Sequence, residues 1–145
     1  MNSKKICDML CGVSDNPKHM DWALLLIRLS VAATFIYHGW AKVSGIDSYI
    51  TMFGSMGISA FFTYIAAYTE FLGGIALALG IMTRLVGGLF AVIMIVAISL
   101  VHFKNGFNSM SSGYEFQLLL LCCSVGLALV GPGSISLHRK WCARH

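Results

Sequence analysis

Charge is scarce in this sequence. Of its 145 residues, 11% are charged and 57% are hydrophobic, and the mean hydropathy is +0.77. So few charges would not cover the surface of a water-soluble domain, and a disordered chain would need more of them. The 2 prolines and the lack of any low-complexity tract also exclude collagen-like and linker-rich proteins. The chain is therefore expected to fold in a lipid bilayer.

Common catalytic and cofactor motifs are missing as well. The sequence has no glycine-rich nucleotide-binding loop, no Cys-x-x-Cys redox pair and no Cys-x-x-Cys-His haem-attachment motif. A haem between His38 and His102 is geometrically conceivable, but two histidines without supporting context disfavour it. No metal site is expected either, because the spacing of Cys7, Cys11 and Cys142 matches no strong zinc signature.

Long apolar runs are what the sequence does contain. Four of them are continuous, at about 22–42, 59–82, 84–102 and 114–131. Each is close to the roughly 20 helical residues that cross a bilayer core of about 30 Å. Because these runs do not alternate apolar and polar residues, helices are favoured over barrel strands. The predicted fold is an all-α integral membrane protein, an up-down bundle of four transmembrane helices.

Three further segments flank or join these runs. Residues 46–57 place apolar side chains at helical spacing, which predicts a short interfacial helix between the first two transmembrane helices. This helix is either a tight connector or a lid over a cavity. Residues 1–21 form a polar N-terminal segment, 22–137 the membrane domain and 138–145 a basic tail. The first helix is expected to be retained rather than cleaved as a signal peptide, because Arg28 interrupts its apolar run.

Lysines and arginines outside the runs or at their ends indicate the orientation. With both termini in the cytoplasm, seven basic residues lie on the cytoplasmic side, namely Lys4, Lys5, Lys18, Arg84, Arg139, Lys140 and Arg144. Lys42 and Lys104 then lie outside, which satisfies the positive-inside rule. The net charge of +4 is thus mainly a topogenic signal, and no nucleic-acid partner is expected. Cysteines on the cytoplasmic side would stay reduced.

Ionisable residues within the runs are the best candidates for a site. Each costs about 2.5–3.5 kcal/mol on insertion scales, so such residues normally face the bundle interior. Arg28, His38 and Lys42 share one stripe of the first helix, with Arg28 in its inner half. Glu70 falls near the membrane midplane on a face of small residues, which predicts that it turns inward. The alternative is a buried ion pair with Arg28 or His38 that only fixes helix register.

The third and fourth helices carry ionisable residues near their ends. Arg84 and His102 mark the two ends of one stripe, and Glu115 shares a stripe with Cys122 and Gly126. If these stripes turn toward the bundle axis, the outer half of the bundle gains a polar cluster. Its members would be His38, Lys42, His102 and Glu115. The end positions are also compatible with simple interfacial anchors, because long charged side chains reach the membrane surface.

Several short motifs follow one another in the order of a known family. They are Arg28, Tyr37-His38-Gly39-Trp40-Ala41-Lys42, Glu70-Phe71-Leu72-Gly73-Gly74, Leu79-Gly80, Thr83-Arg84, His102, Asn105-Gly106-Phe107, Gly113-Tyr114-Glu115, Gly131-Pro132-Gly133 and Ser136-Leu137. In this order the sequence resembles the DoxX family. The resemblance implies a small four-helix protein of the bacterial inner (plasma) membrane and, for some members, a place in a membrane oxidoreductase complex.

The resemblance and the buried charges together suggest a membrane subunit of a quinone- or thiol-linked redox system. Its site residues would be Glu70, His38 and His102 as catalytic groups, Lys42, Glu115, Trp40 and Tyr68 as ligand contacts, and Arg28 and Arg84 as structural anchors. No cofactor is specified, although a quinone fits the aromatic residues of the outer half. Two alternatives stay open: a non-catalytic scaffold or assembly factor, and a carrier of small solutes or metal ions. Besides lipid, the partners would be a redox subunit or a second copy, because glycine and alanine faces leave room for helix contacts.

Overall fold

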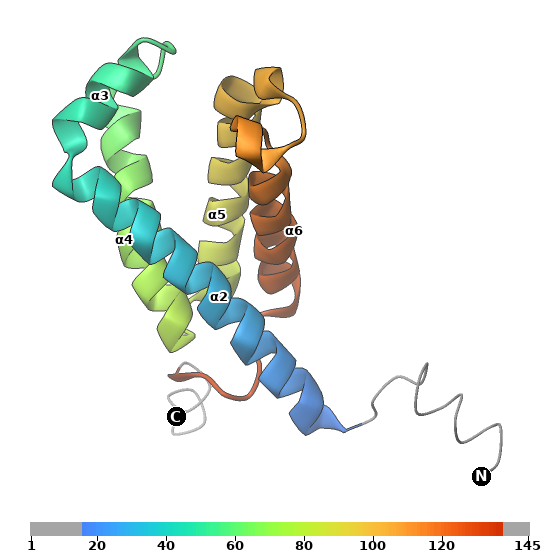
Figure 1. Ribbon diagram of the computed structural model, residues 1–145. Coiled ribbons are helices and arrows are strands. Elements are labelled where there is room, and N and C mark those ends of the chain that lie inside the picture. Colours follow the sequence, from blue (N-terminus) through green and yellow to red (C-terminus); the bar gives the residue numbers. More distant parts are fainter. Residues whose placement is uncertain (1–15, 138–145) are drawn as a thin grey trace, which may run out of the picture.

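A computed structural model describes residues 16–137, so Cys7, Cys11 and Cys142 lie outside the described part. Within these residues the chain is helical and contains no strand. The helices are α2 (Pro17–Ser44), α3 (Ile46–Gly54), α4 (Ala60–Leu79), α5 (Thr83–Ala97) and α6 (Glu115–Val130) (Figure 1). After α5 come a π-helical turn, Ile98–His102, and two short 3-10 helices, Phe103–Asn105 and Ser109–Ser111. The all-helical fold and the short helix between the first two long ones are as predicted.

Helix α2 begins before its apolar run, at Pro17 rather than near residue 22. The side chain of Asn16 caps it by accepting a hydrogen bond from the Lys18 N–H at 3.1 Å. Proline suits the first helical position because its missing N–H would have no partner there. The 28-residue helix is about 42 Å long, so its polar first turns extend beyond a bilayer core of about 30 Å.

Three helical stretches are long and apolar enough to cross a membrane: Pro17–Ser44, Ala60–Leu79 and Thr83–Asn105. Helix α6 is also apolar, but its 16 residues rise only about 24 Å. Many large apolar side chains on all four helices are exposed, as expected for surfaces that lie against lipid rather than water. The described chain therefore has the character of a helical membrane protein.

The helices form two arms (Figure 1). The first arm consists of α2, α3 and α4, and the second arm of α5 and α6. Glycines bring the paired backbones close together, since a Cβ atom on Gly39 of α2 would lie 2.4 Å from the backbone nitrogen of Phe71 in α4. In the second arm, a Cβ atom on Gly87 would lie 2.8 Å from the Ser124 carbonyl oxygen. Small residues at such crossings are typical of packed membrane helices.

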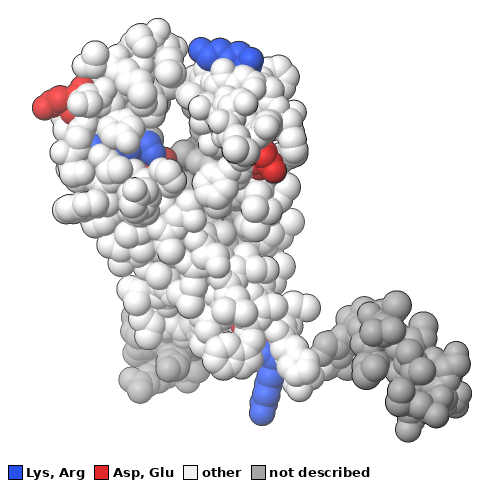
Figure 2. All heavy atoms as spheres, viewed as in Figure 1, with Lys and Arg blue, Asp and Glu red and all other residues white. Residues whose placement is uncertain are grey.

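The two arms share a core over only part of their length. Phe35 of α2 stacks on Phe90 of α5, with ring centroids 3.7 Å apart. Toward the end that carries α3, the core shared by the two arms ends: α3 buries no residue, and the first buried residue of α6 is Leu120. Figure 2 shows the result as an open hollow between the arms at this end. Toward the other end, the core continues through Leu77 and Leu127, which are almost fully buried.

The inward face of α6 differs from the prediction. Helix α6 buries Leu120, Ser124 and Leu127, whereas Glu115, Cys122 and Gly126 are exposed. The predicted stripe of α6 therefore points away from the core. The physical reason is that the charges of α5 and α6 lie at helix ends, where they reach the surface easily and do not dictate which face is buried.

Candidate functional site

Lys42 of α2 and Glu70 of α4 form a buried ion pair. The Lys42 ammonium donates a hydrogen bond to Oε2 of Glu70, and the two side chains are 14% and 3% exposed. Glu70 lies in the middle of a 20-residue apolar helix and turns inward on the face that also buries Thr63 and Ala67. An ion pair of Glu70 with Arg28 or His38 was the alternative considered from the sequence. Of the three basic side chains on this stripe of α2, only Lys42 reaches Glu70.

The pair borders the hollow between the arms. Lys42 and Phe35 are seven residues apart and share a face of α2, and Phe35 points at α5. Lys42 therefore starts from the same side of α2 as Phe35, beyond the last core contact, and its ammonium turns to Glu70 of α4. His38 lies one turn from Lys42 near this face and is exposed. Figure 2 shows basic and acidic side chains adjoining each other on the first-arm wall of the hollow.

Helix α3 adds an aromatic side to this wall. The Lys42 ammonium lies 6.0 Å from the centroid of the Tyr49 ring, at the limit of a cation–π contact. Tyr49 in turn packs edge-on against Phe53, with centroids 5.9 Å apart. Tyr49 lies in the predicted interfacial helix at 46–57 and was not among the predicted site residues. The sequence did contain a signal for this residue, because Tyr49 belongs to the apolar face of the short helix.

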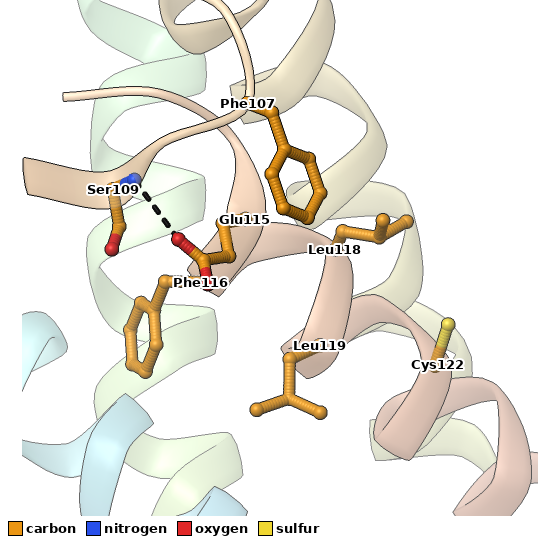
Figure 3. Close-up of a pocket in the computed structure, with 7 residues that line it drawn as sticks. All are labelled: Phe107, Ser109, Glu115, Phe116, Leu118, Leu119 and Cys122. Carbon is orange, nitrogen blue, oxygen red and sulfur yellow. Dashed lines mark hydrogen bonds between the residues drawn. The ribbon is translucent and has the colours of Figure 1, made fainter. Parts of the chain in front are cut away.

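His102 and Glu115 do not join the ion pair. Nδ1 of His102 donates to the Ser112 carbonyl oxygen at 2.7 Å, because a carbonyl can only accept, and Nε2 accepts from the Gln117 amide at 3.1 Å. Glu115 Oε2 accepts from the Ser109 backbone N–H at 3.1 Å (Figure 3). Both side chains thus bind the loop that joins α5 to α6, and the expected four-residue cluster does not form as one contact group.

Trp40 and Tyr68 lie on outward faces of the first arm. Trp40 is 57% exposed and rests on the Phe71 ring, with centroids 5.5 Å apart. Tyr68 is 49% exposed and lies about 200° around α4 from Glu70. Their surroundings are those of aromatic residues at a membrane surface.

Arg28 and Arg84 bind backbone at the end of the bundle opposite the hollow. The buried Arg28 guanidinium donates to the carbonyl oxygens of Pro132 at 2.6 Å and Ile135 at 2.8 Å. Arg84 donates to the Leu129 carbonyl at 2.8 Å, one of the last carbonyls of α6, which have no partner within the helix. The Arg28 contacts fasten the segment after α6 to the first arm, and the Arg84 contact ties the end of α6 to α5 within the second arm.

The His102 network leads to a testable expectation. His102→Phe removes both hydrogen bonds to the loop, so residues 103–114 should exchange backbone hydrogen at least about tenfold faster than in the wild type, which corresponds to about 1.4 kcal/mol of local stability. His38→Phe is the matched control and should leave that loop unchanged. Hydrogen-exchange mass spectrometry in detergent measures both. Equal exchange in the two variants would contradict a loop-holding role for His102.

No metal centre is evident in residues 16–137, where no group of three or more His, Cys, Asp and Glu side chains is placed to hold a metal ion. The buried pair instead offers an ammonium and a carboxylate, from Lys42 and Glu70, and the exposed His38 carries an imidazole one turn away on α2. Such groups bind and orient a polar molecule by hydrogen bonds.

The fold and this buried pair define a helical membrane protein with a polar site inside its first arm. Comparison with known proteins makes the class specific, because the DoxX family profile matches residues 23–103, from α2 through the π-helical turn after α5. The chain belongs to the DoxX family. The matched part includes Lys42 and Glu70, and the resemblance seen in the motifs is thereby confirmed.

Two relatives illustrate the family. The chain is 38% identical over 120 residues to a Bacillus subtilis (strain 168) protein named "Putative oxidoreductase CatD", covering 83% of this chain and 87% of that one. It is 29% identical over 127 residues to the inner membrane protein YqjF of Escherichia coli (strain K12), covering 83% and 96%. No solved structure matches the chain significantly.

Proposed function

We propose that this protein is the membrane subunit of a quinone- or thiol-linked redox system, with its polar site at the hollow. The observation that supports this most is the Lys42–Glu70 pair, buried within the membrane-spanning part of the chain. Ionisable groups are costly there and usually mark function. The name of the Bacillus subtilis relative supports a redox role in the family.

The side chains at the hollow are suited to a flat polar head group. The Lys42 ammonium has three N–H donors, of which one is directed to Glu70, so others are available for an acceptor in the hollow. Glu70 holds the ammonium in place, and Tyr49 offers an apolar ring beside it. His38 would exchange protons with the ligand, because an imidazole both donates and accepts near neutral pH. A quinone bound there would supply two-electron chemistry, with electrons from a partner subunit.

The proposed topology is four up-down spans with both termini in the cytoplasm of a bacterium, in its inner membrane. Asp21, near the start of α2, accepts a hydrogen bond from the Ser134 N–H at 2.7 Å. This contact puts the start of α2 and the segment after α6 at one end, as an even number of spans requires. The name of the Escherichia coli relative agrees with this membrane.

A second candidate function is a non-catalytic scaffold or assembly factor. It is favoured by the hydrogen bonds of His102 and Glu115, which hold the loop between α5 and α6 and keep both side chains away from the Lys42–Glu70 pair. The Lys42–Glu70 pair would then only fix the register of α2 on α4, a role that buried ion pairs fill in some proteins.

The amount of redox-active ligand bound to the purified protein distinguishes the redox subunit from the scaffold. The protein is purified from native membranes in mild detergent, and bound quinones are extracted and identified by mass spectrometry. The redox proposal expects about one quinone or thiol-reactive molecule per chain, reduced at least about tenfold in Glu70→Gln and unchanged in Asp47→Asn, which alters an exposed acid of α3. Wild-type protein without any redox-active molecule would favour the scaffold.

A further inference from the structure

A second cavity lies on the second arm, apart from the Lys42–Glu70 pair (Figure 3). Its volume is about 480 Å³, and its lining consists of Phe107, Ser109, Glu115, Phe116, Leu118, Leu119 and Cys122. It follows α6 from Glu115 to Cys122, seven residues and about 10 Å along the helix axis. That length is roughly two thirds of the ~15 Å hydrocarbon thickness of one membrane leaflet.

The cavity has one polar end and one apolar end. The carboxylate of Glu115 and the hydroxyl of Ser109 lie where α6 begins, beside the polar loop, whereas Leu119 and Cys122 lie deeper along the helix (Figure 3). A membrane lipid has the same order, with its head at the interface and its acyl chain directed toward the midplane. The cavity is therefore shaped for one chain of a lipid that stands beside α6.

The carboxylate selects the head group. Glu115 is exposed and accepts one hydrogen bond, from the Ser109 N–H, so its remaining acceptor positions are open to a donor from the cavity. A primary ammonium supplies both positive charge and N–H donors. A choline head has charge without N–H donors, and an anionic glycerol head is repelled. We propose that this cavity binds phosphatidylethanolamine, with its ammonium on Glu115 and an acyl chain over Leu119 and Cys122.

Native mass spectrometry tests the head-group selection. The purified full chain is titrated with phosphatidylethanolamine, phosphatidylcholine and phosphatidylglycerol of identical acyl chains. Phosphatidylethanolamine should bind about fivefold more tightly than either of the others, as an exposed charge pair allows. Glu115→Gln should remove that preference, whereas Asp47→Asn, which removes another exposed acid, should retain it. Equal binding of the three lipids, or a preference that survives in Glu115→Gln, would overturn the proposal.

A filled cavity provides an independent test of position. Cys122→Trp places a large side chain at the apolar end of the cavity. Leu129→Trp places the same side chain at an exposed position of α6 outside the cavity. Both variants should unfold at wild-type temperature, but only Cys122→Trp should lose bound phosphatidylethanolamine, by about fivefold. Loss in both variants, or a dimer of the chain that Cys122→Trp alone dissociates, would show that lipid is not the specific occupant.

Discussion

Replacing Lys42 by methionine should destabilise the protein more than replacing Lys42 and Glu70 together. The single change leaves the Glu70 carboxylate, which is only 3% exposed, without its partner, and breaking a buried pair in this way costs about 3–5 kcal/mol. In the double variant Lys42→Met, Glu70→Gln no charge remains buried, so the loss should be about 1–2 kcal/mol, that of an imperfectly paired amide. Denaturant unfolding in mixed micelles, followed by circular dichroism, measures the three free energies.

Lys104→Met is the matched control for this cycle, because it removes an exposed lysine from the loop after α5. Its unfolding free energy should stay within about 0.5 kcal/mol of the wild-type value. If Lys42→Met behaves like Lys104→Met, the buried pair contributes nothing to the fold and the site described above has no energetic basis.

Gly39→Leu should have a comparably large effect on the first arm. A Cβ atom at Gly39 would lie 2.4 Å from the backbone nitrogen and 2.7 Å from the Cα of Phe71, and backbone cannot move aside without separating α2 from α4. The cost should be at least about 3 kcal/mol, which exceeds most overpacking effects because no side chain can yield. The Lys42–Glu70 pair should be lost with it, since both partners depend on this crossing.

Gly88→Leu provides the control for this prediction. Gly88 is also helical, but a Cβ atom there meets nothing within 4 Å, so leucine should be tolerated and should even favour the helix slightly. Yield of monodisperse protein and unfolding temperature are compared for both variants. Wild-type behaviour of Gly39→Leu would contradict the close crossing.

The positions of the helices were predictable because each apolar run is continuous and ends at polar residues. Glu70 was also predictable: one carboxylate in the middle of an apolar helix must turn inward, and its small neighbours Ala67 and Gly74 mark the packed face. The start of α2 was missed because the Asn16 cap and Pro17 precede the apolar residues, and hydropathy alone does not register them.

The composition of the site was less predictable. The position of Lys42 near the end of α2 is also typical of an interfacial anchor. Its pairing with Glu70 depends on how Gly39 lets α2 and α4 align, which the sequence of one helix does not indicate. The helical stripes of His102 and Glu115 were expected to face the bundle axis, yet short loop contacts to Ser112 and Ser109 engage the two side chains instead. Periodicity describes one helix at a time and does not fix which face meets a neighbour.

The most direct test of the redox site is quinone binding by the variant that carries both Lys42→Met and Glu70→Gln. A short-chain quinone is titrated into the purified wild type and into this variant, after circular dichroism has shown that both are folded. Binding to the wild type should be saturable at one site per chain, and binding to the double variant should be at least about tenfold weaker. Equal affinity of the two folded proteins, or no saturable binding to either, would contradict a quinone site at the Lys42–Glu70 pair.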